Sequence, residues 1–337
     1  MAETPVRPAE SEQDQQLRGL SSDEREHLMI QAAKLYYELE QTQSEVGRAL
    51  GLNRFQVARL LREARETGIV RIEIEPRANR LPALESRLQK AFGLKEAVIV
   101  RDGENPDAPA LPAVAEAAAR YLAALGPRLT LIGVSWGRTM SAVAERLPAG
   151  WAEGVEVVLL NGATHLRSTR TPTNAVAERF AAAAQGTATL LPVPAILGQA
   201  ATRDALVADP IIRRVLDRGA EAPVACFGLG SLVADSVLVQ SGYIDAEAML
   251  RLRARGAVGD ILGRVIGEDG AISDPELDAR TIGLAPAELR KKDLSIGISA
   301  GRAKHAVVLA ALRARYINVL VADESTARHV MEDRHGS

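Results

Sequence analysis

The sequence predicts an α/β protein in two parts: an N-terminal winged helix-turn-helix, followed by a mostly parallel, three-layer α/β domain. Three observations support this class. At 337 residues the chain is too long for one average domain. Apolar residues recur at helical spacing from Leu28 to Ala64. From Ala97 onward short β-rich runs alternate with helical stretches, which is the pattern of a parallel sheet covered by helices.

Composition and charge exclude several classes of protein. Hydrophobic residues make up 47% and charged residues 25%, which is ordinary globular usage. No apolar run approaches the roughly 20 residues of a membrane span, and the N-terminus has no signal-peptide core, so we expect a cytoplasmic protein. With a single cysteine, Cys226, and five scattered histidines, we expect neither a metal nor a cofactor.

The composition changes along the chain, and these changes predict the domain boundaries. Residues 1–22 are polar and poor in apolar groups, which is typical of a disordered tail. Residues 23–77 form the helix-turn-helix domain, residues 78–95 a linker or oligomerisation helix, and residues 96–335 the larger α/β domain. We therefore expect two folded units with one helix between them.

The first helix of the N-terminal domain is indicated from His27, where apolar residues recur at helical spacing. They are Leu28, Ala32, Leu35 and Leu39, with Tyr36 widening the stripe. Thr42 with Glu45 is a capping box for a second helix, which Gly51 ends. A third helix follows over residues 54–67, and the alternating run at residues 69–74 predicts a strand or wing.

The second and third helices have the spacing of a helix-turn-helix. The motif needs a small residue where the helices meet, a flexible residue in the turn and an apolar residue facing back from the second helix. Gly47, Gly51 and Val57 supply these three in the required order. The net charge of the chain is only −2, but six arginines and two glutamates occur over residues 48–71. This local basic surface favours a DNA-binding helix.

Polar residues at the start of the third helix are expected to face outward and to read bases. Arg can bind guanine, and Gln or Asn can bind adenine, through paired hydrogen bonds in the major groove. The candidates for DNA binding are Asn53, Arg54, Gln56, Arg59 and Arg62, with Arg62 and Arg65 better placed for phosphates. The alternative is a small helical bundle with a solvated arginine face.

The larger domain begins after an amphipathic helix with Leu81, Leu84, Leu88 and Phe92, which could pair subunits. Strands are expected near residues 97–100, 129–134, 155–160, 188–193, 223–227, 293–298 and 317–322. Helices are expected near residues 111–125, 138–147, 174–185, 203–217, 245–255, 302–314 and 325–332. The stretch 256–273 is predicted to form an antiparallel addition or a flap, with Asp269-Gly270 as a tight turn.

Three apolar strands of this domain run into glycine-rich turns, and ligands of open α/β sheets bind at this carboxyl edge. The turns contain Gly137, Arg138 and Thr139, then Gly228 and Gly230, then Gly301 and Lys304. Glycines let backbone N–H groups approach an anion, and Arg, Thr and Lys add donors, so the turns together indicate a phosphate. Asn161-Gly162 and Asp323 end two further strands and could bind sugar hydroxyls, or could be a turn and an N-cap.

The order of motifs resembles the SorC family of sugar-binding transcriptional regulators over residues 28–333. After the helix-turn-helix come GVSWGRTM (133–140), LNGA (160–163), DPIIRRVLDR (209–218), GLGS (228–231), GAVGDILGR (256–264) and AGRAKHAVVLAALRARYINVLVADESTA (300–327). The resemblance implies an effector domain with the fold of sugar-phosphate isomerases, and homo-oligomers, dimers or tetramers, on palindromic double-stranded operators. It implies a phosphorylated sugar bound at Gly137, Arg138, Thr139, Asn161, Gly162, Asp260 and Lys304.

Two enzyme classes were weighed against a regulator. A sugar-phosphate isomerase or deaminase on the same fold would need a base, for which His165 and Asp260 are candidates outside any recognisable catalytic motif. A dehydrogenase is rejected because Gly228 and Gly230 are followed by Val233 where the third glycine of its fingerprint belongs. A fused DNA-binding domain has no use in a metabolic enzyme, so the sequence predicts no catalytic residue.

Overall fold

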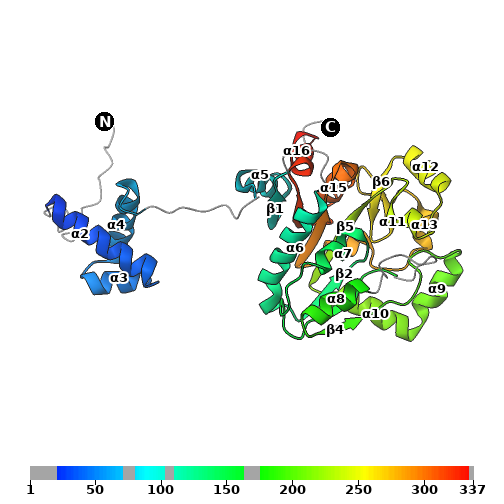
Figure 1. Cartoon of the computed structure of the whole chain (residues 1–337), viewed down its shortest axis with the longest axis horizontal. Helices are drawn as coiled ribbons and strands as arrows, with labels where there is room; N and C mark the ends of the chain where they lie inside the picture. The colour runs from blue at the N-terminus through cyan, green and yellow to red at the C-terminus, as the bar shows by residue number, and fades with distance from the viewer. Residues whose placement is uncertain (1–20, 71–79, 103–109, 163–174, 334–337) are drawn as a thin grey trace, which may run out of the picture. The chain divides into compact units, whose positions relative to one another are not determined.

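The computed structural model describes residues 21–70, 80–102, 110–162 and 175–333. The chain divides into two compact units, Met1–Glu75 and Pro76–Ser337, hereafter the small unit and the large unit. Figure 1 shows the elements of each. Within the described residues, no helix is long and apolar enough to cross a membrane.

The described part of the small unit, residues 21–70, contains three α-helices and a π-helical turn. They are α2 (Ser22–Ala33), η1 (Lys34–Glu38), α3 (Gln43–Leu50) and α4 (Arg54–Glu66). Each α-helix begins at a capping box, in which the N-cap side chain and the third residue bond each other's backbone N–H. Buried Val46, Val57 and Leu60 form the centre of one apolar core.

Two local expectations for the first helix were wrong. It begins at Ser22 rather than near His27, because Ser21 and Glu24 form a capping box at the end of the predicted tail. The rest of that tail lies outside the described residues. The helix also changes to π geometry before Leu39, which is 63% exposed and does not extend the apolar stripe.

The predicted helix-turn-helix spacing is confirmed, but the reason why Gly47 must be small differs from the one expected. Gly51 ends α3 with φ +67, which favours glycine, and Val57 is fully buried. A Cβ on Gly47 would lie 2.5 Å from the Leu52 carbonyl oxygen, so the turn, rather than the facing helix, excludes a side chain there. Ile69 and Val70 pack on the core without forming a strand, and the rest of the predicted wing lies outside the described residues.

The large unit is built on a nine-stranded sheet in which seven strands run parallel in the order β1-β9-β8-β5-β2-β3-β4. These strands are β1 (Glu96–Val100), β2 (Leu131–Val134), β3 (Glu156–Leu159), β4 (Thr187–Thr189), β5 (Val224–Ser231), β8 (Leu294–Ser299) and β9 (Val319–Asp323). The remaining two, β6 (Ala257–Ile261) and β7 (Arg264–Gly267), are antiparallel and extend from the end of β5. The mostly parallel α/β fold is therefore confirmed.

Helices cover both faces of the sheet, which gives the predicted three layers (Figure 1). Alternate strand residues divide between two cores: Val98 faces the core with α6 (Leu111–Leu125), α7 (Arg138–Ala144) and α8 (Ala175–Ala183). Ile99 faces the core with α5 (Pro82–Phe92), α15 (His305–Arg313) and α16 (Glu324–Glu332). The other helices described in the large unit are η2 (Gly126–Arg128), α9 (Ala200–Ala208), α10 (Pro210–Glu221), α11 (Val237–Gln240), α12 (Ala246–Ala254), α13 (Pro275–Ala279), α14 (Pro286–Leu289) and η3 (Arg302–Lys304).

One predicted helix of the large unit differs from the structure. The single helix expected over residues 203–217 is two helices, because Asp209 caps α10 and Pro210 cannot continue α9. The predicted antiparallel addition is present, and the turn between β6 and β7 is Leu262-Gly263, where both φ angles are positive. The predicted tight turn at Asp269-Gly270 is also present, after β7, where the Gly270 N–H donates to the Gly267 carbonyl.

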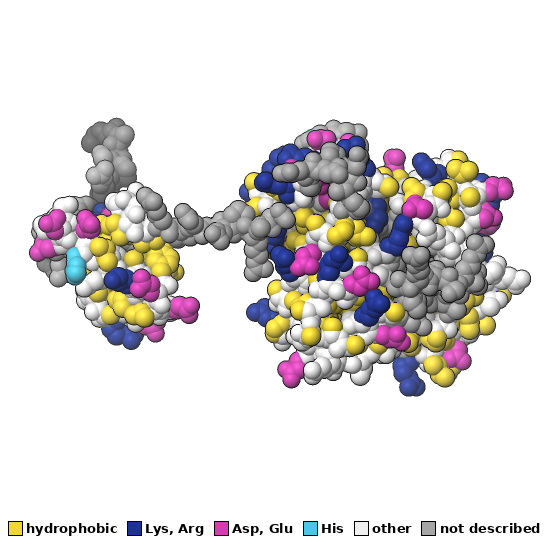
Figure 2. Space-filling model, viewed as in Figure 1, with side chains coloured by type: hydrophobic (Ala, Val, Ile, Leu, Met, Phe, Trp, Pro, Cys, Tyr) yellow, Lys and Arg dark blue, Asp and Glu magenta, His cyan; other side chains and the backbone are white. Residues whose placement is uncertain are grey.

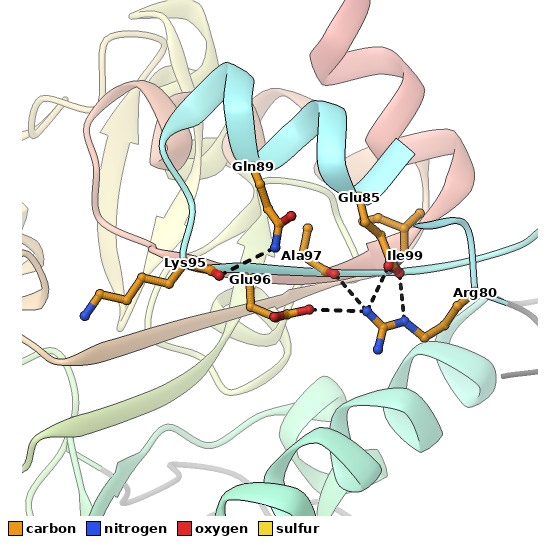
Figure 3. A network of polar contacts seen from close by, with 7 residues as sticks. All are labelled: Arg80, Glu85, Gln89, Lys95, Glu96, Ala97 and Ile99. Carbon is orange, nitrogen blue, oxygen red and sulfur yellow. Dashed lines mark hydrogen bonds and ion pairs between the residues drawn. The ribbon is translucent and has the colours of Figure 1, made fainter. Parts of the chain in front are cut away.

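Helix α5, expected to lie between the two units, packs on the edge of the large unit's sheet (Figure 3). The Glu85 carboxylate accepts hydrogen bonds of 2.8 Å from Nε and Nη2 of Arg80 and from the backbone N–H of Ile99 in β1. Arg80 also donates to Glu96 and to the Ala97 carbonyl. These bonds satisfy part of the free edge of β1 and fix the start of α5 on it.

Candidate functional site

The large unit carries a pocket at the carboxyl edge of its sheet, where the ends of β2, β3 and β5 meet the β6–β7 hairpin and η3. In open α/β sheets, ligands bind outside the carboxyl ends of the parallel strands, so this is the edge at which a ligand site is expected. The pocket is lined by Ser135, Trp136, Gly137, Arg138, Thr139, Asn161, Gly228, Leu229, Gly230, Ser231, Ser236, Val237, Leu238, Asp260, Leu262, Gly263 and Lys304. It contains seven of the eight predicted effector residues, and Gly162 is absent from this lining.

Two of the three predicted glycine turns meet at a direct side-chain contact. The Lys304 ammonium, from η3 after β8, donates a 3.0 Å hydrogen bond to Oγ1 of Thr139, the second residue of α7. Thr139 is buried against Gly228, where a Cβ would lie 3.1 Å from the Thr139 side chain. Residues 165 positions apart are thereby held at one point of the pocket.

Asp260 brings the hairpin into the same pocket. It pairs with Gly230 across the antiparallel β5–β6 ladder, and its carboxylate accepts a 3.1 Å hydrogen bond from the Gly263 N–H. A Cβ on Gly230 would lie 1.9 Å from the Asp260 carboxylate. Gly230 therefore leaves room for Asp260, and the approach of its backbone to an anion stays a prediction.

The charges in the pocket are perturbed by their surroundings. Burial raises the pKa of Asp260 to about 6, against the opposing effects of the Gly263 N–H and Lys304. Burial, helped by the neighbouring Arg138, lowers the pKa of Lys304 to about 8. At neutral pH the pocket therefore holds one carboxylate and one ammonium, both near their titration points.

Arg138 lies at the mouth of the pocket and is half exposed. Its guanidinium makes a 3.0 Å ion pair with Asp235, in the loop between β5 and α11. An exposed pair of this kind contributes little to stability, so the guanidinium can exchange partners at small cost.

Two residues of the pocket lining carry a buried polar atom that has no hydrogen-bond partner among the described residues: Asn161 (Oδ1) and Ser236 (Oγ). A buried polar atom left without a partner is costly, so a bound polar ligand or water is expected to satisfy them. Sequence reasoning missed Ser236 because this residue is the N-cap of α11 (Val237–Gln240), a four-residue helix that was not predicted.

Two residues that sequence reasoning placed near the ligand have structural roles. Gly162 lies where a Cβ would be 2.6 Å from the carbonyl oxygens of Val193 and Pro194, and its own carbonyl accepts a 2.7 Å bond from the Trp136 indole. Asp323 is buried and caps α16 by accepting a 2.7 Å bond from the Thr326 N–H. The N-cap alternative for Asp323 is therefore correct, and His165 lies outside the described residues.

In the small unit, α4 presents a basic surface, but not with all of the predicted residues. Gln56 is only 5% exposed, because its side-chain oxygen accepts a 2.8 Å bond from the Asn53 N–H in the capping box. Asn53 Oδ1 in turn accepts bonds from the N–H groups of Phe55 and Gln56. The expectation that Gln56 faces outward was wrong, because the i and i+3 spacing of the cap turns it inward.

The four arginines of α4 that were predicted to contact bases or phosphates, Arg54, Arg59, Arg62 and Arg65, are all exposed. Arg54 lies over the Phe55 ring with its guanidinium carbon 4.8 Å from the ring centre. Arg59 makes a 3.1 Å ion pair with Glu63, which also binds Arg25 of α2, and Arg62 lies one turn further along. In Figure 2 basic and apolar side chains lie beside one another on the surface of the small unit.

Neither unit shows a metal centre in the part of the chain that the structure describes, where no three metal-binding side chains form a group. The titratable residues of the pocket are instead those of an anion-binding site with one carboxylate. Phosphate and carboxylate ligands are bound in proteins by this combination of lysine, arginine and hydroxyl donors.

Comparison with known proteins is consistent with both units. The Sugar-bind family model, which describes a sugar-binding domain, matches residues 77–332. The chain is 32% identical over 310 residues to the deoxyribonucleoside regulator of Bacillus subtilis (strain 168), covering 92% of this chain and 99% of that protein. It is 29% identical over 320 residues to the erythritol catabolism regulatory protein EryD of Brucella abortus (strain 2308), covering 94% and 99%.

Solved structures show the same fold. The full-length sorbitol operon regulator SorC from Klebsiella pneumoniae aligns with a TM-score of 0.66 at 31% identity, over 92% of this chain and 99% of that chain. A DeoR family transcriptional regulator from Listeria monocytogenes aligns with a TM-score of 0.68 at 26% identity, over 74% of this chain and 98% of that one.

Proposed function

This chain belongs to the SorC-type family of sugar-binding regulators, and from that premise we propose that it is a transcription regulator of carbohydrate metabolism. Its small unit binds operator DNA through α4, and its large unit binds a phosphorylated sugar in the pocket at the sheet edge. The relatives are named as regulators of sorbitol, deoxyribonucleoside and erythritol use.

One observation carries the phosphate assignment: the Lys304 ammonium and Thr139 hydroxyl are in contact at the pocket, with the Arg138 guanidinium at its mouth. Ammonium, hydroxyl and guanidinium groups are all donors to phosphate oxygens. The exposed Asp235 partner of Arg138 is the kind of contact that a phosphate can replace. We therefore place the phosphate between these three side chains.

The sugar hydroxyls are assigned to three further polar residues of the pocket lining: Asn161, Ser236 and Asp260. Asn161 Oδ1 and Ser236 Oγ have hydrogen-bonding capacity that the described protein leaves unused, and the Asp260 carboxylate has further lone pairs beyond its bond to Gly263. Sugar hydroxyls can donate to all of these atoms. A polyhydroxylated ligand would thus remove the cost of burying them unpaired.

We propose sensing rather than catalysis. Isomerisation of a sugar phosphate requires a base at the reacting carbon, usually with a second acid or base to move the proton. The described lining of the pocket has one carboxylate, Asp260, and no histidine. The wider context is a cytoplasmic homo-oligomer, a dimer or tetramer, on a palindromic operator, in which the sugar phosphate changes the affinity for DNA.

If α5 contacts another subunit in such an oligomer, it would do so with the face that points away from the large unit. Its apolar residues Leu84 and Leu88 are buried within the large unit and are not available to a partner. A contact between subunits through this helix would therefore be made by its exposed polar residues.

The test is a thermal-shift screen of purified full-length protein with sugars in matched phosphorylated and unphosphorylated forms. A ligand that binds only the folded state at 100 times its Kd should raise Tm by about 5–10 °C. Only the phosphorylated forms should do so, and Lys304→Met should abolish the shift. Lys291→Met, which removes an exposed lysine paired with Glu288, is the matched control and should retain it.

The assignment fails if unphosphorylated sugars give equal shifts, or if Lys304→Met responds like the wild type. Product analysis of the same incubations distinguishes a sensor from an enzyme, because turnover of a stabilising sugar phosphate would contradict the regulator assignment. DNA binding is measured separately, by fluorescence anisotropy with the DNA upstream of the protein's own gene.

A further inference from the structure

Phe55 lies on the surface of α4 with 72% of its area exposed, more than any other large apolar side chain that the structure describes. It is the second residue of the helix, immediately after Arg54. An aromatic ring in water costs free energy and contributes nothing to the small unit's core. The ring is therefore available to a partner that binds the start of α4.

The capping box decides which side chains of this first turn are free to meet that partner. Asn53 and Gln56 are bound to each other's backbone, and Gln56 is buried. Arg54 and Phe55 are left as the side chains exposed at the start of α4. In a helix-turn-helix the first residues of the second helix contact base edges in the major groove.

The chemistry around Phe55 favours DNA over a protein as its partner. The Arg54 guanidinium lies 4.8 Å from the ring centre, and the exposed cations Arg59 and Arg62 follow on the same helix. These charges complement a phosphate backbone. Within the major groove only thymine, among the four bases, presents a methyl group, and phenylalanine is one of the side chains that contact it.

We propose that Phe55 is a sequence-reading residue that contacts the C5-methyl group of a thymine in the operator, next to the base bound by Arg54. The ring also supports the Arg54 guanidinium, so that the two side chains act as one reading pair. This inference rests on the proposed DNA-binding function and specifies part of the sequence that the small unit recognises.

The experiment uses full-length protein and a duplex selected by it from a random-sequence library. Each thymine of the selected duplex is replaced in turn by deoxyuridine, which lacks only the methyl group. For the wild type, one replacement in each half-site should weaken binding by about fourfold, the effect of removing one buried methyl group. For Phe55→Ala, binding to the parent duplex should weaken by roughly tenfold, and the same deoxyuridine replacement should have no further effect.

Leu39→Ala is the matched control, because Leu39 is 63% exposed in the same unit but lies at the end of η1. It should keep the wild-type affinity and the wild-type response to deoxyuridine. The proposal is overturned if no deoxyuridine position matters, if Phe55→Ala retains that sensitivity, or if Phe55→Ala changes only the oligomeric mass, which would assign the ring to a second copy of the chain. Failure of the wild type to select any duplex would instead contradict DNA binding itself.

Discussion

The small unit and the large unit use polar side chains in opposite ways. At the start of α4, hydrogen bonds connect residues three positions apart, and the arginines beyond them stay exposed. In the pocket of the large unit, Thr139 and Lys304 meet across 165 positions, and burial shifts the pKa values of Lys304 and Asp260. Hydrogen bonds between residues close in sequence therefore determine which side chains the small unit exposes at the start of α4. In the large unit, contacts between residues distant in sequence determine which side chains meet in the pocket. The following experiments test that contrast, from the largest expected effect to the smallest.

The first prediction tests whether the two units are energetically separate. Leu60 is fully buried in the small unit's core, so Leu60→Ala should destabilise that unit by about 2–5 kcal/mol and abolish DNA binding. The increase in Tm of the large unit with a sugar phosphate should be unchanged, as followed by calorimetry. Leu39→Ala, at an exposed site of the same unit, should alter neither property. Loss of the ligand response in Leu60→Ala would contradict the separation.

The second prediction tests the close packing of Gly230 on Asp260. Gly230→Ala places a methyl group against the Asp260 carboxylate and should cost about 1–3 kcal/mol of stability in the large unit. It should also weaken sugar-phosphate binding without affecting DNA binding. Gly198→Ala is the control, since an added Cβ there meets no atom within 4 Å. Equal Tm values for the two variants would show that the pocket tolerates the displacement of Asp260.

The third prediction follows from the lowered pKa of Lys304. Its ammonium is charged below about pH 8 and loses its proton above it, whereas a phosphate monoester is already dianionic by pH 7. Affinity for the sugar phosphate, measured by calorimetric titration, should therefore fall as the pH rises from 7 to 9.5, by up to about tenfold per unit above the pKa. Lys304→Arg keeps its charge throughout, and a similar decline in that variant would exclude Lys304 as its source.

The fourth and smallest prediction separates the cap of α4 from its reading surface. Asn53→Ala should lower the stability of the small unit by about 1 kcal/mol, because two backbone N–H groups lose their acceptor. Asn53→Ser restores an N-cap oxygen and should recover most of this loss in chemical denaturation. Arg54→Ala should leave stability unchanged and weaken operator binding. If Asn53→Ser binds DNA as weakly as Arg54→Ala, then Asn53 reads bases in addition to capping the helix.

The two units also differ in how many of their features could be predicted from the sequence. The helix-turn-helix spacing, the glycine at the turn and the alternation of strands and helices were all predicted, because each is a local pattern of three to fifteen residues. The exceptions have local causes too. The cap at Ser21 went unnoticed, and the pattern that exposes Arg54 also makes Gln56 the buried partner of a cap.

In the pocket, sequence reasoning found the strand ends but not the pairings among them. It named Thr139, Lys304 and Asp260 separately, two of them on turns and the third through family resemblance. It missed the unsatisfied Ser236 hydroxyl and gave Gly162 a ligand role in place of its packing against Val193. Nothing in the spacing of these residues indicates which of them meet.

By itself, the sequence determined the class of each unit, the order of its elements and the helix caps, because hydrophobic periodicity and i, i+3 hydrogen bonds depend on residues close in the chain. Only the tertiary structure decided that Lys304 reaches Thr139, that Gly230 makes room for Asp260, and that Phe55 remains uncovered. The first depends on the parallel pairing of β8 with β5, and the second on the register of the antiparallel β5–β6 ladder. The third depends on which side chains pack against α4. All three are set by packing between segments distant in sequence, which local patterns do not specify.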